Sequence, residues 1–221
     1  MSNTTRTLFI GLGHYSRTGK DTFANYLAAA LRKRAPHLHV LKRPLAWKLK
    51  QITYELYAWA GMQPPEHYET REGEKDRDVV LSALDMTPVQ LWVSFGTKAV
   101  REQVYPATWL DYLLKTRHDA NVIIIPDCRF PNEVDAIKAE GGLAIKIVRP
   151  GYGPRKTVAD RALLGYQGWN YVLGDRGSMK SLSDTAWNFA EWIAGDAPRP
   201  VQTPEAREAA LAVETIEPWE E

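Results

Sequence analysis

A glycine-bearing segment near the amino terminus, Gly13–Thr22, has residue types and a spacing suited to holding phosphate groups. It joins an apolar run at residues 7–12 to a segment with helical periodicity at residues 21–34. At such a junction, backbone N–H groups and the positive end of the helix dipole converge on phosphate oxygens, and a lysine reaches the β- and γ-phosphates. We interpret the segment as a Walker A loop with Lys20 in a catalytic role, rather than as a glycine-rich turn with an exposed lysine. The residues expected to contact the nucleotide are Gly13, Ser16, Arg17, Thr18, Gly19, Lys20, Asp21 and Thr22.

Two positions of this loop depart from the usual pattern. His14 stands five residues before Gly19, where a glycine is expected. Either Gly13 starts a loop that is longer by one residue, or His14 takes the place of the glycine. Asp21 stands where serine or threonine usually binds magnesium, and Thr22 follows it. Asp21 would hold the metal through water, or Thr22 would supply the hydroxyl, and both options stay open.

A second group of candidates follows the β-branched run Val122–Ile125, which has the composition of a central strand in a parallel sheet. Asp127 and Arg129 come directly after it, at the edge where open α/β sheets bind ligands. Asp127 would join the magnesium shell or accept a proton from the acceptor, and Arg129 would bind a phosphate. A purely structural Asp–Arg pair is the alternative.

Basic residues gather in a glycine-bearing segment near residues 150–168, and such a segment can close over a bound nucleotide as a lid. Arg155 and Arg161 are the candidates for a catalytic lid arginine there. A solvated basic loop is the alternative. The cluster consists of Arg149, Arg155, Lys156 and Arg161.

The middle of the chain contains candidates for binding a second substrate. Lys48 and Arg101 would bind the phosphate of an acceptor, although exposed basic residues are common on helices. Trp47 and Trp109 would stack on a base, although packing in the core is the usual role of tryptophan.

The order of elements predicts a three-layer α/β domain over residues 1–195, followed by an acidic, proline-containing tail at 196–221 that is partly disordered, with at most a short helix at 204–213. Residues 63–78 have no apolar period and predict an exposed insertion or flap. Capping boxes predict helices that start at Thr87 and, more weakly, at Thr108. The expected strands lie at residues 7–12, 38–41, 122–125, 143–148 and 169–173.

The composition excludes several classes of protein. The 221 residues carry 28 basic and 27 acidic side chains, so no overall field attracts nucleic acid or a membrane surface. Cys128 is the only cysteine, which rules out an internal disulfide and a cysteine-rich zinc site and fits a reducing compartment. No apolar run is long enough to span a membrane, so we expect a cytoplasmic protein.

Several short motifs occur in one order along the chain: Gly-Lys-Asp-Thr at residues 19–22, Ile125–Arg129 and Val148–Gly151. Three weaker matches are Pro44–Lys48, Phe95–Thr97 and Tyr171–Leu182, the last with Asp175, Gly177 and Ser178. Together these segments resemble the deoxynucleoside monophosphate kinases of tailed bacteriophages. The resemblance spans about Leu8 to Ile193, and its specific parts are the loop and the Asp-x-Arg segment.

This resemblance implies a P-loop kinase fold with a five-stranded parallel sheet, a helical substrate-binding arm near residues 42–118 and a lid near 150–168. It implies ATP and Mg²⁺ as cofactors and transfer of the γ-phosphate to a deoxynucleoside monophosphate, in the host cytoplasm if the chain is phage-encoded. One alternative is a kinase for a hydroxymethyl-pyrimidine, either free or in DNA. Another is a nucleotide-binding switch or ATPase without a small acceptor. A homodimer is an option that the sequence leaves open.

Overall fold

The computed structural model describes residues 7–70, 72–116, 118–156, 158–174 and 178–212. The chain divides into two compact units, and each is described by itself. The first unit combines residues 1–44 with 117–221, and the second comprises residues 45–116. Asp175 and Gly177, which contribute to the resemblance, lie outside the described residues. Within the described ranges, no helix has both the length and the apolar character needed to cross a bilayer.

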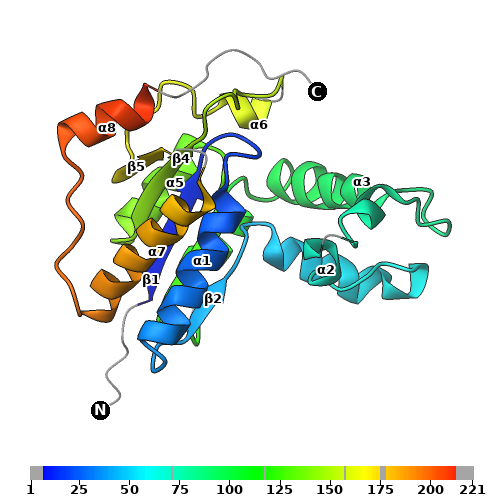
Figure 1. Ribbon diagram of the computed structural model, residues 1–221. Helices are drawn as coiled ribbons and strands as arrows, with labels where there is room; N and C mark the ends of the chain where they lie inside the picture. Colours follow the sequence, from blue (N-terminus) through cyan, green and yellow to red (C-terminus); the bar gives the residue numbers. More distant parts are fainter. Residues whose placement is uncertain (1–6, 71, 117, 157, 175–177, 213–221) are drawn as a thin grey trace. The chain divides into compact units, whose positions relative to one another are not determined.

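A five-stranded sheet forms the centre of the first unit (Figure 1). The strands lie in the order β2-β3-β1-β4-β5, and each neighbouring pair is parallel. The predicted α/β class and the five parallel strands are therefore confirmed. The strands are β1 Leu8–Gly13, β2 Val40–Lys42, β3 Val122–Cys128, β4 Leu143–Val148 and β5 Tyr171–Gly174.

β3 lies between β2 and β1, in the position expected for its β-branched run. Val122 pairs with Val40 of β2 and Leu8 of β1, and Ile123 pairs with Phe9. Residues 123–125 have no exposed surface. A parallel strand that is buried on both faces needs apolar side chains at successive positions, which is why this run shows no alternation.

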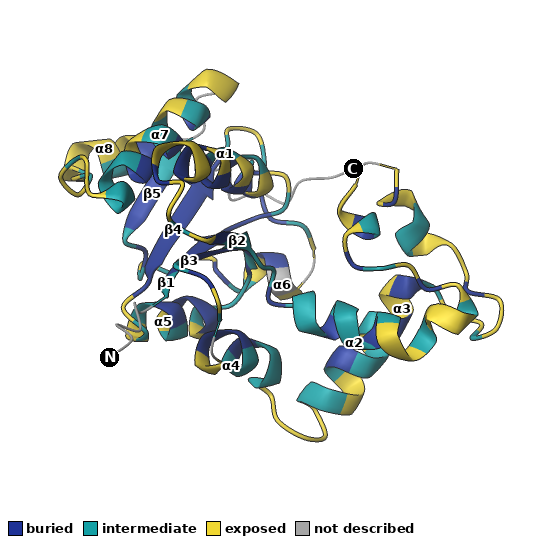
Figure 2. Ribbon diagram, turned by 90° about the horizontal axis from the view of Figure 1, so that it is seen from below, coloured by how far each residue is buried: buried dark blue, intermediate teal, exposed yellow. Residues whose placement is uncertain are grey.

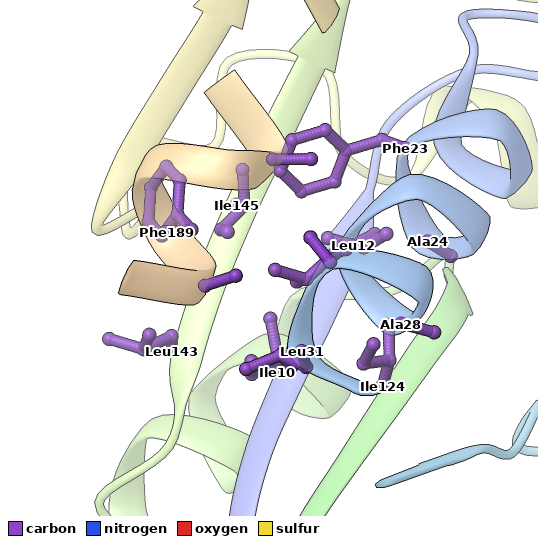
Figure 3. Packing of buried hydrophobic residues seen from close by; sticks show 14 of the residues in the cluster. Ile10, Leu12, Phe23, Ala24, Ala28, Leu31, Ile124, Leu143, Ile145 and Phe189 are labelled. Atoms are coloured by element: carbon purple, nitrogen blue, oxygen red, sulfur yellow. The ribbon is translucent and has the colours of Figure 1, made fainter. Parts of the chain in front are cut away.

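Helices cover both faces of the sheet, as expected for three layers (Figure 2). One face carries α1 (Lys20–Arg34) and α7 (Met179–Ala194), and the other carries α5 (Pro131–Ala139). Between the first pair of helices and the sheet lies the main apolar core, part of which Figure 3 shows. Phe23 of α1 meets Phe189 of α7 edge-on, with ring centroids 6.2 Å apart. This packing holds the first turn of α1 against the ends of the strands.

The start of α5 is specified locally. Pro131 takes the first helical position, where its missing N–H removes no helical hydrogen bond. The carboxylate of Glu133 accepts hydrogen bonds from the backbone N–H groups of Arg129 and Phe130, at 2.7 and 3.1 Å. Glu133 therefore anchors the backbone that carries the Arg129 side chain.

The second unit is built from short helical pieces. Its elements are α2 (Trp47–Tyr57), η1 (Ala58–Ala60), η2 (His67–Glu69), η3 (Lys75–Asp78), α3 (Pro88–Trp92), the π-helix η4 (Val93–Arg101) and α4 (Thr108–Lys115). The capping box at Thr87 is confirmed, because Thr87 Oγ1 accepts from the Gln90 N–H and Gln90 Oε1 accepts from the Thr87 N–H. The predicted box at Thr108 is wrong: the N-cap is Ala107, and Thr108 Oγ1 donates to the Tyr105 carbonyl instead.

Residues 63–70 and 72–78 are largely exposed, but one aromatic side chain among them is buried. Tyr68 is 1% exposed, and its ring meets Trp92 edge-on with centroids 5.1 Å apart. Its hydroxyl accepts a hydrogen bond from the Gln63 N–H at 3.0 Å. The expectation of an exposed segment is therefore wrong at Tyr68, because a single aromatic anchor in irregular backbone produces no periodic signal.

The described part of the tail, residues 196–212, has a defined path along the first unit. The Gln202 side chain accepts from the Val172 N–H at 2.8 Å and donates to the Val172 carbonyl, so it pairs with β5 as a further strand would. The Tyr171 hydroxyl donates to the Pro200 carbonyl. A short helix follows, α8 (Pro204–Leu211), as predicted. The composition suggested disorder here, but side chains that satisfy the sheet edge hold these residues in place.

Candidate nucleotide-binding site

The loop between β1 and α1 contains three residues with positive φ. Gly13 ends β1, and Gly19 is the N-cap of α1 with φ 94°. His14 and Arg17 also have positive φ, 109° and 61°. His14 thus takes the conformation for which a glycine was expected, at a cost in backbone strain that non-glycine residues at functional sites often carry.

The base of the loop tolerates no side chain at Gly13. A Cβ atom built there would collide with the Trp169 ring, which is 5% exposed, and would lie 3.4 Å from the Cys128 carbonyl oxygen. The ends of β1 and β3 therefore meet at Gly13, together with the ring of Trp169, which lies just before β5. This close packing fixes the point at which the loop leaves the sheet.

Lys20 is the first residue of α1 and is 5% exposed. Its Nζ donates to the Tyr15 carbonyl within the loop, and Thr18 Oγ1 donates to the same carbonyl at 3.1 Å. Lys20 is therefore folded back across the loop, and its ammonium group is held against the loop backbone.

The electrostatic surroundings of Lys20 disfavour its charge in the structure as it stands. Burial is the largest cause that lowers its pKa to about 7, and the charge of Arg129 adds to the effect. Carboxylates act in the opposite direction without compensating fully; they belong to Asp21, Asp160 and Asp127. These three carboxylates therefore offset only part of the effect that burial and Arg129 have on the pKa of Lys20.

The candidates for holding magnesium lie at two places in the first unit. Asp21 is exposed and Thr22 is half-buried, both in the first turn of α1. Asp127 is half-buried near the end of β3. The part of the chain that the structure describes contains no cluster of three or more His, Cys, Asp or Glu side chains suited to a metal.

Asp160, to which the sequence assigned no role, lies at the meeting point of the candidate residues. It belongs to α6 (Val158–Arg161) and is 4% exposed. Its Oδ1 accepts from Arg129 Nη1 at 2.5 Å and from Ser16 Oγ at 3.1 Å, and its Oδ2 accepts from the Arg155 N–H at 3.2 Å. Arg129 Nη1 also donates to Ser16 Oγ at 3.2 Å. The one signal in the sequence was that Asp160 is the single acid among the basic residues of 149–161.

The basic residues of the predicted lid do not all approach the loop in the same way. Arg149 Nη1 donates to the Arg17 carbonyl at 3.3 Å, and its guanidinium stacks on the Tyr152 ring at 4.3 Å. Arg155 is half-buried and meets Asp160 through its backbone. Arg161 is exposed on α6. Lys156 is exposed as well.

The acceptor-binding candidates belong to the second unit. Trp109 Nε1 donates to the Gly96 carbonyl at 3.0 Å, and Arg101 Nε donates to the Pro106 carbonyl at 3.1 Å. The Lys48 ammonium lies over the Tyr112 ring, 5.7 Å from its centroid. Trp47 is half-buried at the start of α2. Trp109, Arg101 and Lys48 thus have a structural contact within the second unit. For all four residues a role in acceptor binding stays a prediction.

Comparison with known proteins gives the relatives of this chain. No family model matches it. A putative deoxynucleotide monophosphate kinase of Acanthamoeba polyphaga mimivirus is 28% identical over 165 residues, 68% of this chain and 78% of that protein. The deoxynucleotide monophosphate kinase of Enterobacteria phage T4 is 31% identical over 114 residues, about half of either chain, 49% of this one and 47% of the phage protein. The resemblance to viral deoxynucleotide monophosphate kinases is confirmed.

The solved structures include shikimate kinase from Acinetobacter baumannii in complex with shikimate, which matches 88% of this chain and 97% of its own with a TM-score of 0.41 and 14% identity. The names of the two viral deoxynucleotide monophosphate kinases describe phosphoryl transfer to a nucleotide. The first unit contains a loop with a buried lysine and an arginine held next to it.

Proposed function

We propose that this chain is an ATP-dependent nucleotide kinase that transfers the γ-phosphate of ATP to a deoxynucleoside monophosphate. The observation that carries the proposal is Lys20, buried at the first turn of α1 in a loop with left-handed backbone at His14, Arg17 and Gly19. The similarity to two viral proteins named for this activity supports the choice of acceptor.

The residues of the first unit fit a magnesium–nucleotide complex. The loop from Gly13 to Thr22 would surround the β- and γ-phosphates, and their charge would offset the burial and the neighbouring arginine that lower the pKa of Lys20. Asp21 or Thr22, together with Asp127, would hold the magnesium ion, which neutralises phosphate charge when it is bound.

Catalysis in this proposal is mainly positioning and charge stabilisation. Lys20 binds the donor phosphates, and Arg129 neutralises charge on the phosphoryl group in transit. Arg155 and Arg161 lie on either side of Asp160 in the sequence and would add positive charge when the segment closes over the nucleotide. Lys48 and Arg101 would bind the acceptor phosphate, and Trp47 and Trp109 would contact its base.

The direct test is a screen of acceptors. The protein is incubated with γ-labelled ATP, Mg²⁺ and each deoxynucleoside monophosphate in turn, and with DNA containing hydroxymethyl-pyrimidines as a separate sample. We expect label on a mononucleotide and loss of transfer when magnesium is chelated. Label that appears on DNA alone would contradict the proposed acceptor, and release of phosphate without an acceptor would indicate an ATPase.

Lys20→Ala tests the role of the loop in the same assay. Removal of the ammonium group should lower kcat by about a thousandfold, because a charge aimed at the transferred group is lost. The matched control is Lys180→Ala, which removes an exposed lysine from α7 and should leave activity unchanged. Circular dichroism checks the fold of both variants. Full activity of Lys20→Ala would show that the loop does not bind the donor phosphates.

A further inference from the structure

Asp160 is a buried carboxylate that the proposed reaction does not use directly, yet it connects three separate parts of the first unit. Its contacts come from the phosphate loop through Ser16, from the segment after β3 through Arg129, and from the candidate lid through the Arg155 backbone. A carboxylate that is 4% exposed normally carries such partners, because an unpaired buried charge is costly.

The contacts of Arg129 indicate how Asp160 affects the site. Among the described residues, Nη1 is the one guanidinium nitrogen of Arg129 with hydrogen-bond partners, and it donates to both Asp160 Oδ1 and Ser16 Oγ. Within the described ranges, Nε and Nη2 of Arg129 have no hydrogen-bond acceptor. The side chain is 29% exposed, whereas that of Asp160 is 3% exposed. One corner of the guanidinium is therefore held inside the protein, and its other two nitrogens remain available for a ligand.

A guanidinium that is held in a fixed orientation binds phosphate more favourably than a mobile one. Arginine binds phosphate through two parallel N–H groups, and that geometry is productive only when the plane of the guanidinium has the right orientation. A flexible arginine loses side-chain entropy when it binds, whereas one that is already fixed at Nη1 loses less. The backbone of Arg129 is anchored as well, because its N–H donates to Glu133.

We propose that Asp160 is a positioning residue for Arg129: it fixes the guanidinium at Nη1 beside Ser16 and thereby aims Nε and Nη2 at a phosphate bound in the loop. This inference rests on the proposed function. It assigns Asp160 an indirect role, since its carboxylate accepts hydrogen bonds from Arg129, Ser16 and the Arg155 N–H. It also explains why the single acid of the basic segment is its most buried charged side chain.

The test is a double-mutant cycle in the acceptor assay. Asp160→Asn keeps the shape of the side chain and removes its charge, and it should lower kcat by about 10- to 100-fold with a smaller change in the KM for the acceptor, as expected when a supporting group is lost. Arg129→Ala should lower kcat by about a thousandfold. The double variant Asp160→Asn/Arg129→Ala should be no worse than Arg129→Ala alone, because Asp160 acts through Arg129.

The control variant is Asp184→Asn, which removes the charge of an exposed aspartate on α7 and should leave kcat and KM unchanged. If the double variant lost as much kcat as the product of the two single losses, the proposal would be overturned, because Asp160 would then act independently of Arg129. A fall in thermal stability with unchanged kcat would also overturn it, since the ion pair would then be only structural. An Asp160→Asn variant that binds ATP more tightly and reacts faster would overturn it too, because the carboxylate would merely compete with phosphate.

Binding of Mg-ATP, measured by calorimetry on the same variants, separates this inference from the proposed function. Asp160→Asn should weaken binding by about tenfold, and the double variant should match Arg129→Ala. If the wild type binds ATP in this pattern but transfers phosphate to no mononucleotide, the proposed acceptor fails and the positioning role stands. If the wild type is active and the binding losses are additive, the positioning role fails and the kinase stands.

Discussion

Each of the two compact units of this chain is stabilised internally by a different kind of interaction. The first has a parallel sheet whose strands pair residues more than 100 positions apart, such as Phe9 with Ile123, and whose central strand is buried on both faces. The second relies on side-chain contacts between short helical pieces over shorter separations, such as the 39 positions between Thr53 and Trp92. Trp92 Nε1 donates to the buried Thr53 hydroxyl at 3.1 Å, and the Lys50 ammonium lies 5.1 Å from the centre of the Trp92 ring.

This difference shows where the molecule has a rigid framework and where it can adapt. A phosphate cradle requires backbone N–H groups and cations at fixed positions, and such sites are most accurate on strands and helices that share a large core. The second unit consists of short helices, turns and a π-helix, and irregular helical backbone of this kind often occurs at functional sites. We expect its backbone to open more readily than that of the sheet.

Hydrogen exchange should show the largest contrast between the units. The β3 amides should open only with global unfolding, which in small domains costs roughly 5–15 kcal/mol. Amides in η2 (His67–Glu69) and η3 (Lys75–Asp78) should open at a few kcal/mol or less, because these turns are short and largely exposed. Mass spectrometry of peptides from the two segments checks this. Equal protection in both would remove the distinction between the units.

Removal of the ring at Phe189 should produce the largest loss of stability from a single substitution in this comparison. Phe189 is 2% exposed and contacts the rings of Phe23 and Tyr171. Phe189→Ala should lower the free energy of unfolding by about 3–5 kcal/mol, measured by urea denaturation. Val201→Ala, at a side chain that is 88% exposed in the same unit, is the control and should change it very little. Similar effects for the two would show that the core in Figure 3 does not dominate stability.

Loss of a single cap in the second unit should have a smaller effect. Thr87→Ala removes the acceptor for the Gln90 N–H at the start of α3 and should cost about 1 kcal/mol. Thr87→Ser keeps the hydroxyl and should restore most of the stability. Chemical denaturation followed by tryptophan fluorescence reports the change, because Trp92 ends the same helix. A serine variant as unstable as the alanine variant would show that the cap contributes nothing.

Much of the first unit could be predicted because its signals are local. The run at 122–125 indicated a buried strand, and β4 has the predicted limits. In the second unit the predictions were poorer. The Thr87 box was visible as a sequence pattern, but burial of Tyr68 depends on a contact with Trp92, 24 residues later, which no local pattern records.

The sequence by itself determined where the phosphate loop lies and which strand and helix flank it, because glycine spacing, a lysine and apolar periodicity act on neighbouring residues. Only the tertiary structure decided which side chains meet there. Ser16 and Asp160 are 144 positions apart and Arg129 and Asp160 are 31 apart. They come together because β1, β3 and β4 are parallel, so the segments that follow them leave the sheet at the same edge.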